Sequence, residues 1–262
     1  MDKLSEYKIK NEFKHNGVSL TRQKEIEKLI HSIRSTRDGE RTFFDTKDFP
    51  WVSQVEKHWI DIRRELDSLL NAIESLPAFQ EIQPEQSDIS NNADWKIFPL
   101  CAYGWWPESS AARCPITVEV LKNIPGIKAG MFSIFKSGKI VPPHFGPYCG
   151  VLRYHLGVKI PNNYELCGIR VGKDTKFWRE GKSLIFDDTH DHEAWNHSDD
   201  VRVVLFIDFE RPLYDELDSM NQEAISTIKN SNFITDVVKQ YEEWDEKYGH
   251  EIDNILRTQS SQ

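Results

Sequence analysis

The sequence has few cysteines, and none is placed as in a zinc knuckle or a disulfide scaffold. It contains Cys101, Cys114, Cys149 and Cys167, with no Cys-x-x-Cys pair among them. Zinc knuckles depend on that close spacing, and small secreted scaffolds carry a denser cysteine pattern. Cysteine usage therefore excludes both classes and predicts a reducing compartment, most simply the cytoplasm.

The sequence also lacks an excess of basic residues. Lysine and arginine number 33 against 42 aspartate and glutamate residues, so the formal net charge is −9 and the isoelectric point is near 5.5. Proteins that bind nucleic acid through its phosphate backbone usually show the opposite balance. We therefore expect no nucleic-acid partner.

Long hydrophobic runs are missing as well. The first residues form no apolar signal core. No stretch approaches the roughly 18 apolar residues that a membrane-spanning helix requires. We expect a cytoplasmic protein. This expectation is compatible with a peripheral contact with the inner membrane. The sequence says nothing about oligomeric state.

The 262 residues, of which 39% are hydrophobic, are enough for one substantial core. We predict one domain with three successive parts. Residues 1–127 supply helical support and the first strands, residues 128–212 form a β-rich core, and residues 213–262 form C-terminal helices. Residues 1–18 are polar and expected to be loose.

Apolar residues recur at three- and four-residue spacing in several segments, which is typical of helices packed on a core. One helix is expected to begin near Pro50, because proline at the first helical position loses no hydrogen bond. Residues 74–94 are expected to form a long connection. Helices are predicted over residues 19–33, 50–73, 115–123, 213–229 and 233–256.

From residue 128 onward the hydrophobic period changes to two, which is typical of β-strands. Short strands follow one another at close spacing, separated by turn residues. This pattern predicts a mainly β fold with flanking helices, a double-stranded β-helix of the jelly-roll or cupin-like kind. Strands are predicted over residues 42–45, 95–100, 131–135, 151–160, 167–171, 183–186 and 201–209.

Two histidines lie in loops of this β-rich part. His144 lies in Val-Pro-Pro-His-Phe-Gly and His192 in Asp-Asp-Thr-His-Asp-His-Glu. Non-haem iron oxygenases usually hold iron with two histidines and one carboxylate, commonly as His-x-Asp/Glu followed by a later histidine. Here Gly146 stands at the carboxylate position. A carboxylate from the second loop or a water molecule would have to fill the place, the candidates being Asp187, Asp188, Asp191 and Glu193.

Spacing alone does not identify the second histidine. His190 and His192 lie two residues apart and would share a face of a strand, and His197 is a third candidate. A histidine in such a segment is also compatible with an ordinary surface or core residue. The alternatives are therefore left open at this point.

Arg202 sharpens the interpretation. It follows His192 by ten residues and lies on the most apolar predicted strand, where an unpaired guanidinium would be costly. A buried arginine needs an anion, either an internal carboxylate or a ligand. Because 2-oxoglutarate can chelate iron with one end and present a carboxylate at the other, it is the obvious ligand to expect.

Together these segments resemble the aspartyl/asparaginyl β-hydroxylase family. The resemblance extends over about residues 128–212 and implies an Fe(II)- and 2-oxoglutarate-dependent dioxygenase that uses O₂ to hydroxylate an unactivated C–H bond. It is carried by Ser-Ile-Phe at 133–135, Pro-His-Phe-Gly-Pro at 143–147, Leu-Arg-Tyr-His-Leu-Gly at 152–157, Trp-Arg-Glu-Gly-Lys at 178–182, Phe-Asp-Asp at 186–188, His-Glu-Ala-Trp at 192–195 and Arg202.

The resemblance also implies roles for individual residues. Family members with His-x-Gly hold iron through two histidines only, so His144 and His192 are expected to be the catalytic metal ligands. Arg202 is expected to bind the 2-oxoglutarate carboxylate, with Ser133 beside it. Arg153 and His155 are expected to be further cosubstrate contacts.

The expected substrate follows from a departure within the family. Animal members that hydroxylate aspartate have an arginine at the position of Val151. The segments at residues 150–157 and 210–213 look closer to a bacterial branch of lipid A and Kdo hydroxylases. We therefore expect a lipopolysaccharide component, the Kdo sugar of Kdo-lipid A, with Trp105 and Trp106 as candidates for lipid contact or simple core packing.

Three alternatives remain at the level of sequence. The first is β-hydroxylation of an aspartyl or asparaginyl side chain, peptidyl, carrier-bound or free. The second, from a different class, is a cupin-like module that binds sugar or metal without turnover. The third is a metal-independent sugar isomerase in which His144 and His192 act as acid and base.

Overall fold

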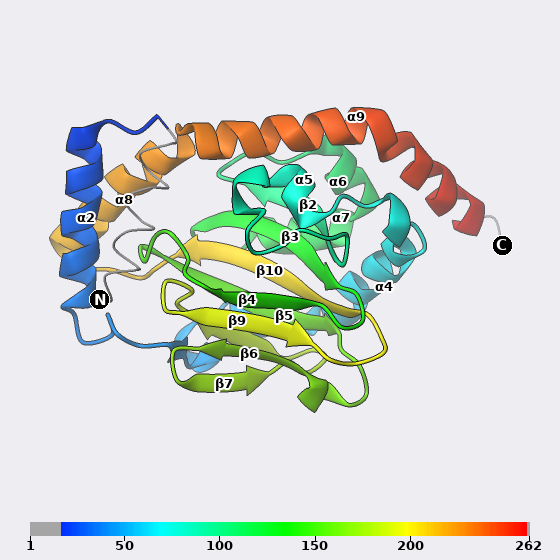
Figure 1. Ribbon diagram of the computed structural model, residues 1–262, viewed down its shortest axis with the longest axis horizontal. Coiled ribbons are helices and arrows are strands. Elements are labelled where there is room, and N and C mark those ends of the chain that lie inside the picture. Colours follow the sequence, from blue (N-terminus) through cyan, green and yellow to red (C-terminus); the bar gives the residue numbers. More distant parts are fainter. Residues whose placement is uncertain (1–16, 261–262) are drawn as a thin grey trace.

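The computed structural model describes residues 17–260, with side chains up to residue 258. The expected loose start at residues 1–18 lies almost entirely outside this range. Within the described range, ten strands form two sheets, and helices cover the larger sheet (Figure 1). The described helices of four or more residues are α2 (Leu20–Arg34), α3 (Val52–Lys57), α4 (Trp59–Leu70), α5 (Phe79–Ile82), α6 (Glu108–Arg113), α7 (Pro115–Lys122), α8 (Asp215–Lys229) and α9 (Asn232–Ser260).

Both sheets are antiparallel throughout. The larger has the strand order β1-β8-β5-β10-β3-β2 and the smaller β4-β9-β6-β7. Strands that are distant in sequence therefore alternate within each sheet, as in a jelly roll, and the expected double-stranded β-helix is confirmed. The strands are β1 (Phe43–Phe44), β2 (Trp95–Ala102), β3 (Ile127–Phe135), β4 (Ile140–His144), β5 (Val151–Lys159), β6 (Cys167–Val171), β7 (Asp174–Phe177), β8 (Ser183–Phe186), β9 (His192–Asn196) and β10 (Arg202–Glu210).

The central strand β10 shows how the larger sheet acquires two different faces. Leu205 is paired with Phe132 of β3 and Leu156 of β5, and this apolar row faces the covering helices α4 and α7. Because successive side chains alternate, Phe206 and its partner His155 lie on the opposite face. The polar residues of the site are thus presented on the inner face, toward the smaller sheet.

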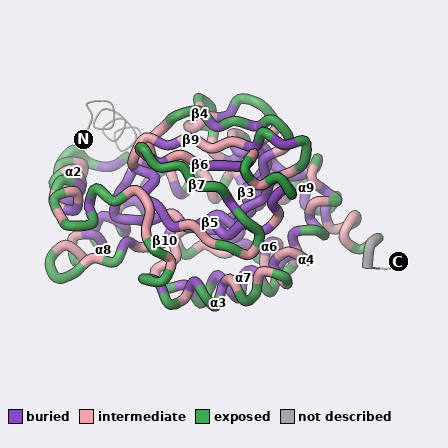
Figure 2. Tube along the Cα trace, turned by 90° about the horizontal axis from the view of Figure 1, so that it is seen from below, coloured by how far each residue is buried: buried purple, intermediate pink, exposed green. Residues whose placement is uncertain are grey.

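Helices α2 and α8 pack on each other at one end of the molecule, beside the barrel (Figure 1). Their buried faces join a second hydrophobic cluster, while their outer sides are exposed (Figure 2). The long helix α9 runs across the top of the view in Figure 1 and contacts α4, α5 and β2. The helices therefore close one end of the barrel as well as supporting its outer sheet. The division into three parts within one domain stays a prediction.

Most predicted elements are confirmed, including the face of α2 formed by Ile26, Leu29, Ile30 and Ile33. The single helix expected over residues 50–73 is wrong, because the chain leaves helical geometry at His58 and divides into α3 and α4. After this break, the indole Nε1 of Trp59 donates to the carbonyl of Val158 on β5 at 3.1 Å. The break thus lets the second helix follow the sheet.

The two segments interpreted as histidine loops are also corrected. His144 is the last residue of β4 and His192 is the first residue of β9, and the two strands pair. The connection expected over residues 74–94 contains short helical turns, including α5. These elements were hard to recognise from the sequence because they are short and contain proline or polar residues. Their apolar residues find their contacts in the folded barrel.

Candidate active site

The site begins with two histidines that face each other across a strand pair. His144 and His192 are directly opposite in the register of β4 and β9, and their ring centroids are 4.0 Å apart. His190 instead contacts Arg34, and His197 is exposed and stacks on Trp195. The structure therefore brings His144 and His192 together and leaves the two other candidates apart from them.

Backbone carbonyls fix the orientation of both rings. His144 Nδ1 lies 2.8 Å from the carbonyl oxygen of Pro142, and His192 Nδ1 lies 3.0 Å from that of His190. A carbonyl only accepts, so each Nδ1 carries the hydrogen and each Nε2 the lone pair. Burial lowers the pKa of His192 well below its usual value, which keeps the ring neutral. This is the tautomer and protonation state that a metal ligand requires.

The four acidic residues proposed as a third ligand are all engaged by arginines. Asp188 lies 2.7 Å from Arg153, while Asp191 and Glu193 lie 2.9 and 2.6 Å from Arg170. Asp187 contacts two further arginines. Among residues 17–260, no group of three or more histidine, cysteine or acidic side chains is arranged to hold a metal ion. The donor set that the chain offers is the histidine pair.

Glycine at position 146 has a steric reason. A Cβ atom added to Gly146 would collide with the carboxylate of Asp188, and the amide of Gly146 donates to the Asp188 carbonyl at 2.8 Å. An acidic side chain at position 146 would therefore have to displace Asp188 from Arg153. The departure from His-x-Asp/Glu is built into the packing of the second histidine segment.

Arg202 is almost completely buried and has no acidic partner within 4.0 Å among the described residues. Its guanidinium lies between the rings of Phe135 and Trp178, and one Nη donates to the carbonyl of Ser133 at 3.2 Å. Its Nε has no hydrogen-bond partner, and burial lowers its pKa. A buried guanidinium in this state fits a ligand carboxylate, which would supply the missing acceptor.

Ser133 and His155 lie on the same inner face as Arg202. Ser133 is opposite Val204 in the strand register, and its hydroxyl accepts a hydrogen bond from the indole of Trp95 at 3.1 Å. Neither ring nitrogen of the buried His155 has a hydrogen-bond partner. Burial, with the nearby arginine charges, lowers the pKa of His155 well below its usual value. This neutral ring adds two unsatisfied polar atoms to the interior, which a bound ligand would satisfy.

Arg153 has a different environment from Arg202. It makes a bidentate pair with Asp208 at 2.9 and 3.0 Å and a third contact with Asp188 at 2.7 Å. Its pKa is raised by the two carboxylates, which outweigh burial. The structure thus gives Arg153 internal partners. Its expected role as a cosubstrate contact stays a prediction, as do the roles of Ser133 and His155.

An apolar pocket adjoins the histidine pair. Its cavity volume is about 160 Å³, and His144, Arg153 and Asp188 lie in its wall. Val151 lines the pocket too, and it stands at the position where an arginine is expected in family members that hydroxylate aspartate. The apolar lining comes from β2, β3 and β10, from the helices α5 and α9, and from the turn at residues 87–89, and includes Phe79, Ile82, Ile89, Trp95, Ile97, Met131, Phe206, Phe233, Ile234 and Val237.

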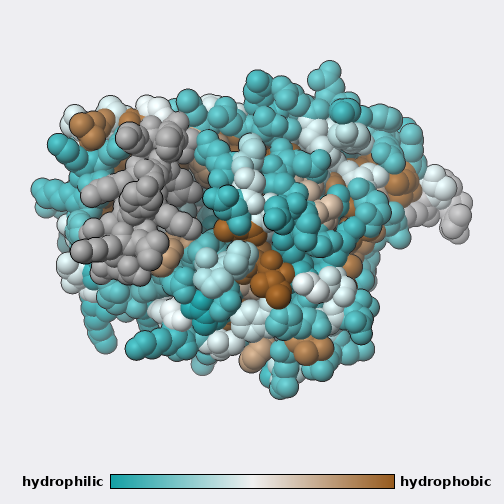
Figure 3. All heavy atoms as spheres, in the orientation of Figure 1, coloured by the Kyte–Doolittle hydropathy of each residue, from teal (hydrophilic) through white to brown (hydrophobic). Residues whose placement is uncertain are grey.

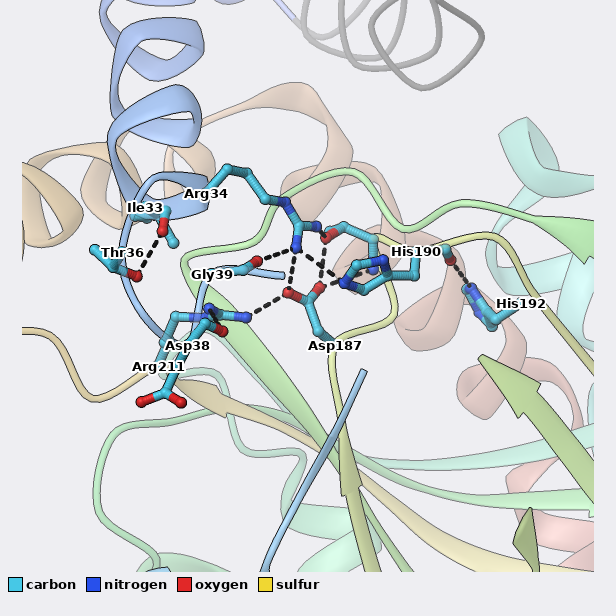
Figure 4. Close-up of polar contacts among 10 residues, drawn as sticks. Ile33, Arg34, Thr36, Asp38, Gly39, Asp187, His190, His192 and Arg211 are labelled. Atoms are coloured by element: carbon cyan, nitrogen blue, oxygen red, sulfur yellow. Dashed lines mark hydrogen bonds and ion pairs between the residues drawn. The ribbon is translucent and has the colours of Figure 1, made fainter. Parts of the chain in front are cut away.

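Sequence reasoning missed a second buried polar cluster beside this site. The Asp187 carboxylate contacts Arg34 of α2 at 3.0 Å and also accepts hydrogen bonds from Arg211 and Thr189 (Figure 4). Asp187 was considered only as a metal ligand. No local pattern relates Arg34 to the second histidine segment, because the two are far apart in the chain. Arg211 directly follows the last strand, but its partner likewise depends on the fold.

The aspartyl/asparaginyl beta-hydroxylase family matches residues 56–212 of this chain. This segment contains the histidine pair, Arg202 and the strands that carry them. The chain belongs to this family, and it is accordingly a hydroxylase. Helices α2, α8 and α9 lie outside the matched segment.

Named relatives extend the comparison. An ornithine lipid ester-linked acyl 2-hydroxylase from Rhizobium tropici is 40% identical over 217 residues, which cover 83% of this chain and 77% of the relative. Human aspartyl/asparaginyl beta-hydroxylase is 34% identical over 62% of this chain, which spans only 21% of that protein. Human aspartate beta-hydroxylase domain-containing protein 2 is 28% identical over 76% of this chain and 56% of its own length. Among the described residues, no helix is long and apolar enough to cross a membrane.

Proposed function

We propose that this protein is an Fe(II)- and 2-oxoglutarate-dependent dioxygenase that hydroxylates a C–H bond of a lipid acyl chain. The observation that carries the proposal is the combination of two facing histidines, a buried arginine without a carboxylate, and an adjoining apolar pocket. The family result favours this reading over the sugar-binding module and the metal-independent isomerase, since its named members are hydroxylases.

Each group in the proposed reaction has a residue to hold it. His144 and His192 would bind Fe(II) through Nε2, and the Arg202 guanidinium would bind the distal carboxylate of 2-oxoglutarate, with Ser133 and His155 beside it. With iron bound, 2-oxoglutarate and O₂ give succinate and CO₂, and one oxygen atom enters the substrate C–H bond. The protein's own contribution is to orient the two imidazoles, neutralise the carboxylate and keep the interior dry.

The lining of the pocket favours an acyl chain over a sugar. The side chains beyond His144 are mainly aliphatic and aromatic, and Val151 adds an apolar surface. Phe79 and Trp95 stack at 3.7 Å between ring centroids and lie in the pocket wall. A Kdo sugar would bury hydroxyl groups against this surface without partners. Sugar and aspartyl substrates therefore remain as second candidates, the latter supported by the family's named activity.

The entrance suggests how the rest of a lipid is held. Ala102, Tyr103, Trp105 and Ile234 line both the apolar pocket and a shallower hollow that is open to solvent. Lys229 and Lys239 line the hollow, together with Glu242. An acyl chain in the pocket would place its head group here, where two ammonium groups and one carboxylate suit a head group with both charges.

Most of the face shown in Figure 3 is hydrophilic. Hydrophobic side chains gather near its middle, in the region where Figure 1 draws β4, and in smaller groups toward its edges. That face offers no broad hydrophobic surface to a membrane. The internal pocket is therefore the better receptor for an acyl chain. Trp105 supports this reading, since it lines the pocket and its indole donates to Glu242 at 3.3 Å.

The direct test is turnover with three purified substrates: an ornithine lipid with an ester-linked acyl chain, Kdo-lipid A, and an aspartyl peptide. Iron, 2-oxoglutarate and O₂ are supplied, and mass spectrometry follows one added oxygen while succinate is measured separately. We expect oxygen in the acyl chain of the ornithine lipid. Oxygen in the sugar or the peptide alone would overturn the acyl assignment, and absence of succinate with every substrate would overturn the dioxygenase assignment.

A charge-reversal pair tests the entrance. Replacing Lys229 and Lys239 together with glutamate is expected to raise the KM for a lipid whose head group carries a carboxylate and an ammonium about tenfold, through loss of roughly 1–2 kcal/mol of electrostatic attraction to the carboxylate. The matched control replaces Lys24 and Lys28 of α2, which are outside both pockets. Equal KM values for the two double variants would exclude the head-group role.

A further inference from the structure

The cluster around Asp187 joins an N-terminal helix to the segment that carries His192 (Figure 4). Arg34 lies in the last turn of α2 and reaches this segment from outside the part of the chain that matches the family. It is mostly buried, and Asp187 is completely buried. A buried ion pair between distant parts of the chain cannot be explained as an ordinary solvated surface contact.

The guanidinium of Arg34 contacts several residues of the segment that precedes β9. One Nη contacts the Asp187 carboxylate at 3.0 Å and the Nε2 of His190 at 3.0 Å, and the other donates to the Thr189 hydroxyl. The carbonyl of Gly39 accepts from the same guanidinium. Arginine is suited to this task because its planar fork makes several hydrogen bonds in fixed directions.

His190, which Arg34 contacts, in turn contacts His192. His190 offers its backbone carbonyl to Nδ1 of His192 at 3.0 Å. Arg34 contacts the side chain of that same residue, so only His190 separates the guanidinium from the ring of the proposed metal ligand (Figure 4). By contrast, His144 is oriented by Pro142 of its own strand. The two imidazoles therefore depend on different supports.

We propose that Arg34 is a positioning residue for His192, so that helix α2 takes part in forming the metal site. The inference rests on the proposed assignment of His144 and His192 as metal ligands. Loss of outer hydrogen-bond partners of metal-binding histidines typically weakens metal affinity 10- to 100-fold. The expected consequence of removing Arg34 is a loss of this size.

The test uses the complete chain with Arg34→Ala, and Co(II) as a spectroscopic probe of the metal site in the absence of turnover. We expect the dissociation constant for Co(II) to rise 10- to 100-fold at a temperature where circular dichroism shows a folded protein. Hydrogen exchange of the backbone amides at 187–192 should accelerate in parallel. Arg34→Lys, which keeps the charge but not the fork, is expected to recover only part of the affinity.

Arg22 provides the matched control, since it lies on the same helix and makes exposed ion pairs with Glu25 and Glu223. Arg22→Ala is expected to bind Co(II) as the wild type does. If Arg34→Ala does not fold, Arg34→Gln is measured in its place. A folded Arg34 variant with wild-type Co(II) affinity and unchanged exchange at 187–192 would overturn the proposal, whereas failure of the wild type to bind metal would overturn the histidine assignment itself.

Discussion

Arg202 and Arg211 are buried and Arg34 is mostly buried, but Arg202 differs from the two arginines around Asp187 in what it contacts. Arg34 and Arg211 share the carboxylate of Asp187, which balances part of their charge inside the protein. Arg202 lies between aromatic rings and has one backbone carbonyl as its hydrogen-bond acceptor. The charge of the buried arginines around Asp187 is therefore balanced by a carboxylate of the protein, whereas the charge of Arg202 is not.

The difference separates support from binding. A paired buried ion stabilises the native arrangement chiefly because removal of one partner leaves the other uncompensated. An unpaired buried cation is retained at a cost to stability, and a ligand carboxylate reverses that cost on binding. Arg153 belongs with the first region, since Asp188 and Asp208 both contact it. Only Arg202 among these four has the environment of a ligand-binding arginine.

The largest effect is expected from breaking the paired region. Asp187→Asn leaves Arg34 and Arg211 buried without a carboxylate, and we expect the free energy of unfolding to fall by about 3–5 kcal/mol. Denaturant titration of the metal-free protein measures the change. The control is Asp191→Asn, whose pair with Arg170 is partly exposed and is expected to contribute about 0–1 kcal/mol. Similar losses for the two variants would show that burial of Asp187 has no special consequence.

Arg202→Met is expected to have the opposite pattern. Without 2-oxoglutarate the variant should be as stable as the wild type, or more stable, because no internal ion pair is lost. Its dissociation constant for 2-oxoglutarate should rise about 30- to 1000-fold, equivalent to about 2–4 kcal/mol. Calorimetric titration of the metal-loaded protein and denaturant titration of the metal-free protein give the two values. A destabilised variant with unchanged 2-oxoglutarate affinity would place Arg202 with the supporting arginines.

The effect of a one-unit change in pH is smaller, and it concerns the second carboxylate on Arg153. Burial raises the pKa of Asp188 to about 7, against the attraction of Arg153. The folded protein then keeps a proton that the unfolded chain releases near pH 4, so stability falls as pH rises from about 4 to 7, by up to about 1.4 kcal/mol per pH unit. The free energy of unfolding of the wild type should therefore fall relative to Asp188→Asn across this range. Parallel curves for the two proteins would contradict the raised pKa.

The barrel could be predicted from sequence because its signals are local. The apolar run of β10 and the helical face of α2 follow from residues a few positions apart. His144, His192 and Arg202 could be proposed because an apolar strand makes a lone arginine conspicuous. The break at His58 was not predictable in the same way, since the apolar spacing continues across it.

The partners of buried polar groups could not be predicted, because they depend on which strands and helices meet. Asp187 and Asp188 are adjacent in sequence, yet one contacts Arg34 and Arg211 and the other Arg153. Side chains of neighbouring residues leave the backbone in different directions, and distant elements supply their partners. The apolar pocket was missed for the same reason, since α5 and α9 reach it only in the folded chain.

The central claim, that the histidine pair and Arg202 form one site for iron and 2-oxoglutarate, is tested most directly by anaerobic titration of Fe(II) and 2-oxoglutarate. The visible metal-to-ligand charge-transfer band is followed in the wild type, His144→Ala and Arg202→Met. We predict a band in the wild type, none in His144→Ala, and a band in Arg202→Met only at much higher 2-oxoglutarate concentration. An iron-loaded wild type without the band, or an Arg202→Met titration that matches the wild type, would contradict the claim.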